Sequence, residues 1–171
     1  MAISMYQASI PVFVQFLNSL SAILKKGADY AAAKKFDPAI LVNTRLAPDM
    51  FALARQIQIA TDHAKGAAAR LTGSEVPSYP DTETSIEALQ ARIAKTIEFV
   101  KSFKPEQFEG SDERKITLRV GGEDRTFVGC DYLFHFALPN FYFHTTTAYA
   151  ILRHNGVDIG KRDFVGVLKT V

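Results

Sequence analysis

The chain has 171 residues, a formal net charge of +2 and 47% hydrophobic residues. This length suits one domain over residues 1–171 with a sizeable core, and the hydrophobic content excludes a disordered chain. The nearly balanced charge gives no electrostatic case for a nucleic-acid partner.

Cysteine content and the N-terminal segment predict the compartment. A single cysteine cannot form an intramolecular disulfide, which is typical of a reducing environment. No basic residue precedes the N-terminal apolar segment, and polar residues interrupt it, so it resembles neither a signal peptide nor a membrane span. We therefore expect a cytoplasmic protein with no membrane partner.

Helical spacing predicts a long first helix over residues 3–26. Its apolar residues advance by threes and fours: Tyr6, Ile10, Phe13, Leu17, Leu20 and Leu24. Pro11 either kinks this helix or marks where its regular part begins. Gly27 is a weak stop signal, and the Ala-rich residues 28–35 could continue the helix. Asp37 and Pro38 then predict the start of a short helix.

A second long helix is predicted over residues 50–71, with Gly73 as its C-terminal signal. Its many alanines, together with Gly66, allow neighbouring backbones to approach closely. Tight packing in a bundle explains this composition without any binding site.

The third helix is predicted to begin after Thr82 or Thr84, either of which can serve as N-cap, and to end before Pro105. Its polar residues are predicted to form a solvated face: Glu83, Glu87, Arg92, Lys95 and Glu98. This helix therefore offers no candidate site.

The hydrophobic period then changes from helical to alternating over residues 116–128. Gly121 and Gly122 stand between the two alternating runs, which is the signal of a two-residue β-hairpin. Because a lone hairpin is marginal in water, we expect it to lie on the bundle, at the ends of the third and fourth helices.

A fourth helix is predicted over residues 131–156, apolar on nearly every side and closed by Asn155 and Gly156. Pro139 either kinks it or separates a short piece over residues 132–136 from the main helix. The predicted fold is therefore all-α, a four-helix bundle with a small β-hairpin between the third and fourth helices.

The aromatic residues of the fourth helix also predict association. A helix that is apolar all round must be buried all round, whereas a bundle covers about one face. The hairpin and the C-terminal tail could cover part of the remainder. A second copy of the chain is the commonest other solution, so we expect a homodimer.

Two polar residues of the fourth helix are the leading site candidates. Asn140 and His144 stand four residues apart and share one face of the helix. An inward histidine needs a hydrogen-bond partner, which Asn140 or Gln56 could provide. A histidine that is merely satisfied in the core explains the same pattern.

A second cluster near the start of the fourth helix is weaker. Cys130 and Asp131 near His135 suggest a thiol with a base, but no oxyanion arrangement accompanies them. A small buried filler is the commoner role for such a cysteine.

Four fragments carry a resemblance to a known superfamily: MYQASIPVF, RLAPDMF, HFALPNFYFH and AILRHNG. With the helix order and the hairpin position, they resemble the DinB/YfiT-like superfamily of metalloenzymes and, within it, an uncharacterised bacterial subfamily. The resemblance covers essentially the whole chain. It implies a divalent metal held by one histidine on the second helix and an H-x-x-x-H pair on the fourth. Some members of the superfamily use the metal to activate a low-molecular-weight thiol.

This sequence departs from that metal site. His144 takes the second position of the pair, but Asn140 stands at the first, and the second-helix position falls near Gln56, with His63 two turns further on. Neutral carboxamides are weak ligands for zinc and nickel. The resemblance therefore implies a degenerate site formed by Gln56, His63, Asn140 and His144. It would hold no cofactor or a weakly bound divalent metal on His63 and His144.

Three functions remain open from the sequence. The leading hypothesis is a protein that binds a small molecule in a pocket between the second and fourth helices. The second is a metal-dependent thiol transferase or hydrolase in which His63 and His144 hold the ion. The third is a homodimeric interaction protein without catalytic activity.

Overall fold

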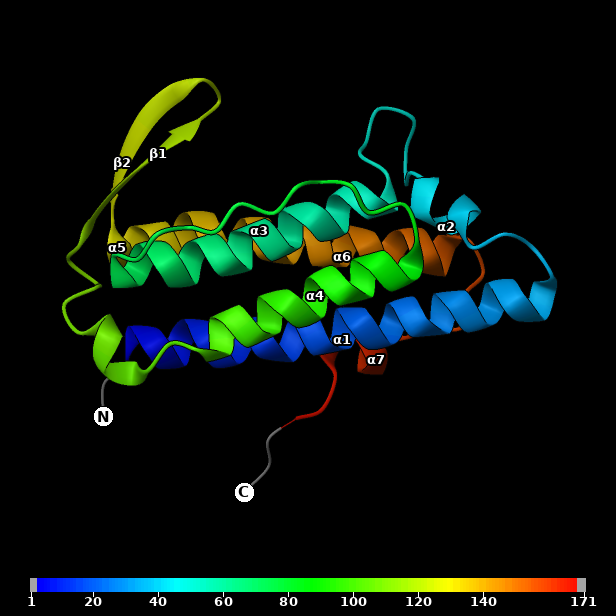
Figure 1. Ribbon diagram of the computed structural model, residues 1–171, viewed down its shortest axis with the longest axis horizontal. Helices are drawn as coiled ribbons and strands as arrows, with labels where there is room; N and C mark the ends of the chain where they lie inside the picture. Colours follow the sequence, from blue (N-terminus) through cyan, green and yellow to red (C-terminus); the bar gives the residue numbers. More distant parts are fainter. Residues whose placement is uncertain (1–2, 169–171) are drawn as a thin grey trace.

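In the computed structural model, which describes residues 3–168, four long helices form an elongated bundle (Figure 1). They are α1 (Met5–Lys34), α3 (Leu53–Thr72), α4 (Ile86–Lys101) and α6 (Leu138–His154). α3 packs most extensively against α6, and α1 packs most extensively against α4. Figure 1 shows these pairs as two layers, with α3 and α6 above α1 and α4.

The helix count of a four-helix bundle is not matched, because short helical elements join the four long helices. They are α2 (Ala39–Asn43), the 3₁₀-helix η1 (Pro105–Phe108), α5 (Gly129–Asp131), the π-helical segment η2 (Tyr132–Ala137) and α7 (Lys161–Val165). The fold is nevertheless mostly helical, with one small antiparallel sheet, as the sequence predicts.

α1 extends eight residues past its predicted end. Its N-terminus is fixed by a capping box, in which the Ser4 hydroxyl accepts from the Gln7 amide and the Gln7 side chain accepts from the Ser4 amide. Gly27 does not stop the helix, because a Cβ there would lie 3.3 Å from the Leu152 side chain, so its small size serves packing against α6. The helix ends where Lys35 adopts a left-handed backbone, with φ of 59°.

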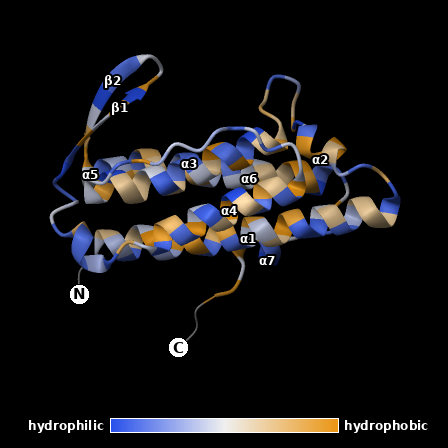
Figure 2. Ribbon diagram, in the orientation of Figure 1, coloured by the Kyte–Doolittle hydropathy of each residue, from blue (hydrophilic) through white to orange (hydrophobic). Residues whose placement is uncertain are grey.

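The core lies where the long helices face one another. Figure 2 shows their hydrophobic residues gathered along these facing sides. Phe13 of α1 and Phe141 of α6 are fully buried, and their rings meet edge to face with centroids 5.0 Å apart. All alanines of α3 except the partly buried Ala54 are also buried, which allows α6 to approach this helix closely.

The hairpin consists of β1 (Lys115–Val120) and β2 (Glu123–Val128), with a turn at Gly121 and Gly122 as predicted. The prediction that it lies on the bundle is wrong: it extends away from the helices (Figure 1). Part of it packs on the core, through buried Ile116, through partly buried Leu118 and through Phe127, whose ring is 5.5 Å from that of Phe136. Because β2 is mostly hydrophilic (Figure 2), its outer part has little apolar surface to bury.

Pro139 lies in the first turn of α6, and the chain stays helical on both sides of it. The π-helical segment η2 joins α6 directly, so a short helical segment precedes the main helix as in the second alternative, but the two are continuous rather than separated. The Asn140 side chain donates to the Phe136 carbonyl oxygen at 2.7 Å and so satisfies a backbone acceptor at this junction.

The C-terminal segment covers part of the aromatic surface of α6. Phe164 of α7 packs against Phe16 and Tyr149, with ring centroids 5.3 Å and 5.7 Å away. Phe134 and Phe143 keep 45% and 56% of their surface exposed. The tail therefore covers one side of α6, and apolar surface remains on another.

Candidate functional site

His144 and Gln56 form the centre of the candidate site, across the interface between α6 and α3. Both side chains are buried, and His144 Nδ1 lies 2.7 Å from Gln56 Oε1. The Gln56 amide nitrogen donates to the Phe51 carbonyl oxygen at 3.0 Å, so its oxygen faces the histidine. An amide oxygen only accepts, so His144 Nδ1 carries the proton and Nε2 carries a lone pair.

His63 of α3 is the second histidine of the site. Its ring lies 6.1 Å from that of His144, and the two planes differ by 15°. Phe136 packs edge to face on His63 at 5.6 Å. No hydrogen bond within residues 3–168 engages either His63 nitrogen or His144 Nε2, and none of these three atoms is sealed from solvent. The two imidazoles therefore present unpaired polar atoms to water.

Both histidines are uncharged at neutral pH. Burial and, to a smaller extent, the neighbouring His144 lower the pKa of His63 to about 4, while Asp62 opposes the shift. Burial also lowers the pKa of His144 to about 4, with a smaller contribution from the positive charge of Arg55. Such lowered values, at groups that still reach solvent, are typical of functional sites.

Aromatic and cationic side chains surround the histidine pair. The half-exposed Phe143 ring packs edge to face on His144 at 5.1 Å. Phe51, also half-exposed, lies beneath the Arg55 guanidinium, which is 6.0 Å from its ring centroid. Arg55 forms an ion pair with Asp81, so its charge has a partner. The site thus combines neutral imidazoles with exposed apolar surface.

The structure brings together three of the four predicted site residues. Gln56, His63 and His144 are neighbours, but Asn140 bonds to the Phe136 carbonyl instead. At the second cluster, Cys130 is exposed, unlike a buried filler, and Asp131 and His135 form an exposed contact of 3.9 Å. That geometry does not resemble a shielded nucleophile with its base.

The side chains at the histidine pair do not match the divalent metal site that the family resemblance implies. Within residues 3–168, no three His, Cys, Asp or Glu side chains are grouped to hold an ion. The Gln56 oxygen could serve as a weak metal ligand, but it already accepts a hydrogen bond from His144. Two neutral imidazoles alone do not fit a three-histidine centre.

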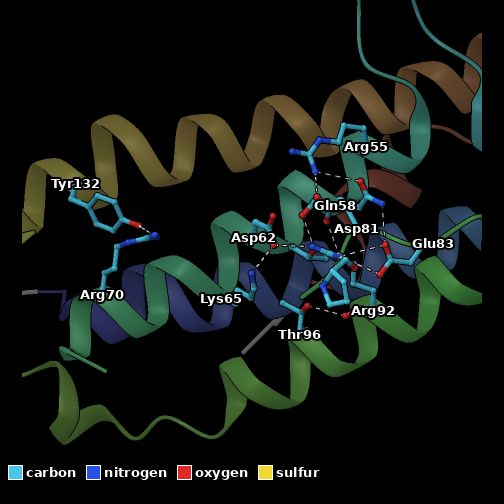
Figure 3. Close-up of polar contacts among 12 residues, drawn as sticks. Arg55, Gln58, Asp62, Lys65, Arg70, Asp81, Glu83, Arg92, Thr96 and Tyr132 are labelled. Atoms are coloured by element: carbon cyan, nitrogen blue, oxygen red, sulfur yellow. Dashed lines mark hydrogen bonds and ion pairs between the residues drawn. The ribbon is translucent and has the colours of Figure 1, made fainter. Parts of the chain in front are cut away.

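A buried ionic cluster between α3, α4 and the preceding loop was missed from the sequence (Figure 3). The Arg92 side chain, predicted to be solvated, is only 2% exposed, and Glu83 is 12% exposed. Arg92 Nη2 lies 2.8 Å from Asp62, Nη1 lies 3.1 Å from Glu83, and Nε donates to Thr61 at 2.8 Å. Its position beside buried Ile93 on the apolar side of α4 was the available signal.

Three surface cavities lie away from the histidine pair. One of about 720 Å³ lies between α1 and the C-terminal segment, one of about 590 Å³ lies at the start of α1, and one of about 360 Å³ lies beside α4. None of the three is lined by His63 or His144. A ligand at the histidine pair would therefore occupy surface between α3 and α6, outside these cavities.

Comparisons with known proteins agree with the architecture. A family model described as a domain of unknown function, DUF1993, matches residues 5–165. The crystal structure of a DinB family member protein from Shewanella denitrificans is 38% identical, with a TM-score of 0.92. That match covers 98% of this chain and 94% of the other. Among curated proteins, no sequence matches the chain.

Proposed function

Since the chain belongs to the DinB family, and within it to the group described as DUF1993, we propose that it binds a small molecule between α3 and α6, at the surface that His63 and His144 border. This proposal rests on the position of the two imidazoles between the packed helices and on their open nitrogen atoms.

The unpaired nitrogens are the single observation that carries the proposal. A histidine retained only for packing is expected to have its polar atoms satisfied. The His144 ring forms a hydrogen bond only through Nδ1, and the His63 ring forms none within the described residues. Because burial holds both rings neutral, their lone pairs can accept a hydrogen bond from a ligand.

We further propose that this site does not hold a metal tightly. Two neutral imidazoles give a divalent ion neither a third protein ligand nor a negative charge. If such a metal did bind, His63 and His144 would be its ligands. It would supply Lewis-acid chemistry, as in the alternative function of a metal-dependent thiol transferase or hydrolase.

The experiment uses the full chain with ¹⁵N-labelled histidine. A fragment library is screened by following the ring nitrogen signals, and ligands are expected to shift His63 and His144 but not the exposed His154. His144→Phe should abolish these shifts. A library in which no compound moves either ring would overturn small-molecule binding. Stoichiometric zinc or nickel after purification without added metal would instead favour the metal-dependent enzyme.

A second proposal concerns a contact between copies of the chain. Phe134 and Phe143 leave large aromatic surfaces exposed on η2 and α6, where a second copy could cover them. In sedimentation equilibrium we expect the mass of a homodimer, and Phe143→Glu should shift it toward one chain. A one-chain mass across the micromolar range would contradict this proposal.

The cytoplasmic location also stays a proposal. α1 is long and apolar enough to cross a membrane by length and composition, yet its buried residues form part of the bundle core. Fractionation of cells that express the chain would test the location, with recovery in the membrane pellet as the contradicting result.

A further inference from the structure

Resting on the proposed function, we infer that the histidine site selects an uncharged ligand that donates a hydrogen bond from an O–H or N–H group carried on an apolar body. The protonation pattern of His144 and the side chains around it determine this selectivity.

Gln56 determines which nitrogen of His144 faces a ligand. Its amide nitrogen is engaged by the Phe51 carbonyl, and its oxygen is engaged by His144 Nδ1. Rotating the amide by 180° would set the Gln56 oxygen against the Phe51 carbonyl oxygen, and both of these atoms are acceptors. These two contacts of Gln56 therefore hold His144 in the Nδ1–H tautomer and leave Nε2 as a hydrogen-bond acceptor that faces solvent.

A ligand anion would be a poor match for this acceptor. A carboxylate needs a proton on Nε2, which would require the imidazolium form. Because the one proton of the neutral ring is engaged with Gln56 at Nδ1, Nε2 would present a lone pair to the anion.

A ligand cation is also disfavoured. Asp62, the acid whose charge acts on His63, is already paired with Lys65 at 2.6 Å and with Arg92 at 2.8 Å. The site therefore has no unpaired carboxylate among these neighbours to hold an ammonium group.

The surroundings of the acceptor are apolar. Phe143 packs edge to face on His144, and Phe136 packs in the same way on His63. The half-exposed Phe51 ring lies beneath Arg55, the residue next to Gln56. A ligand that places its donor at Nε2 can therefore cover exposed aromatic surface with the rest of its body.

Four probes of similar size separate the possibilities: phenol, anisole, benzoate and benzylammonium. Their affinities for the full chain are measured by titration of the histidine ring ¹⁵N signals. Phenol should bind about five- to tenfold more tightly than anisole, because only phenol can donate to Nε2. Benzoate and benzylammonium should bind more weakly than anisole. In His144→Phe, the difference between phenol and anisole should disappear.

The ring tautomer is read from the same spectra of the unliganded wild-type chain, so the inference is testable even if His144→Phe fails to fold. An Nε2–H tautomer would overturn it. Equal binding of phenol and anisole, or tightest binding of benzoate or benzylammonium, would overturn the ligand class but keep small-molecule binding. If none of the four probes shifts His63 or His144, both this inference and the proposed function fail for small aromatic ligands.

Discussion

His144 Nδ1 lies 2.7 Å from Gln56 Oε1, and this contact joins α6 to α3 across 88 positions of sequence. It satisfies two buried polar groups at once, and it fixes the orientation of the only His144 nitrogen that stays open. One hydrogen bond thus connects the stability of the bundle with the chemistry of the candidate site.

His144→Ala should lower the free energy of unfolding by about 1–4 kcal/mol. The Gln56 oxygen would lose its partner while buried, and the missing ring would leave a cavity. Urea denaturation at pH 7 measures the change. The matched control is His154→Ala, an exposed position near the end of the same helix, which should stay within about 0.5 kcal/mol of wild type. An unchanged midpoint for His144→Ala would contradict the structural role.

Stability should fall as the pH is lowered from about 6.5 toward 4. Unfolded histidines take up protons near 6.5, whereas the native pKa values of His63 and His144 are about 4. The unfolded state therefore binds more protons in this window, which favours unfolding. Between pH 7 and pH 4.5 we expect a loss of about 2–3 kcal/mol in total, allowing for the solvent contact of both rings.

The check on this pH dependence is a series of urea denaturation curves between pH 4.5 and 7.5. His63→Gln removes one titrating ring, so its stability should fall less steeply over this range. His154→Ala should retain the wild-type slope, because its ring is exposed. A wild-type stability that is constant over the range would show that neither histidine is held neutral by the fold.

Arg92→Met should destabilise the fold by about 3–5 kcal/mol. It removes the buried cation that pairs with Asp62 and Glu83, so that Glu83 loses this cation and Asp62 keeps only Lys65. Chemical denaturation gives the value, with Glu98→Gln on an exposed part of α4 as the control. If the two variants were equally stable, the cluster in Figure 3 would contribute little to the fold.

Gly129→Ala should lower the melting temperature by about 6–12 °C. A Cβ at this position would lie 1.8 Å from the Ser111 carbonyl oxygen, so the backbone of the 111–112 region would have to move. Overpacking of this kind costs about 3 kcal/mol, which corresponds to that shift for a chain of this size. Gly160→Ala is the control, because nothing lies within 4 Å of its added Cβ. Equal melting temperatures would contradict the close approach.

Local patterns in the sequence were enough to predict the long helices, the hairpin turn and the inward face of α6. Each depends on residues a few positions apart. These are the apolar residues of α1 that recur every three or four positions, the adjacent Gly121 and Gly122, and the apolar neighbours of His144. These local patterns show which face of a helix or strand is apolar. That face must be buried away from water, whichever element it packs against.

The tertiary structure decided what those faces meet. Whether His144 pairs with Gln56 or Asn140, and whether His63 stands beside it, depends on the register between α3 and α6, which no local spacing specifies. The burial of Arg92 likewise depends on acids that the loop before α4 and the facing helix α3 bring to it. The sequence by itself therefore determined the elements and their apolar sides, and long-range packing decided the protonation pattern and partners of the site.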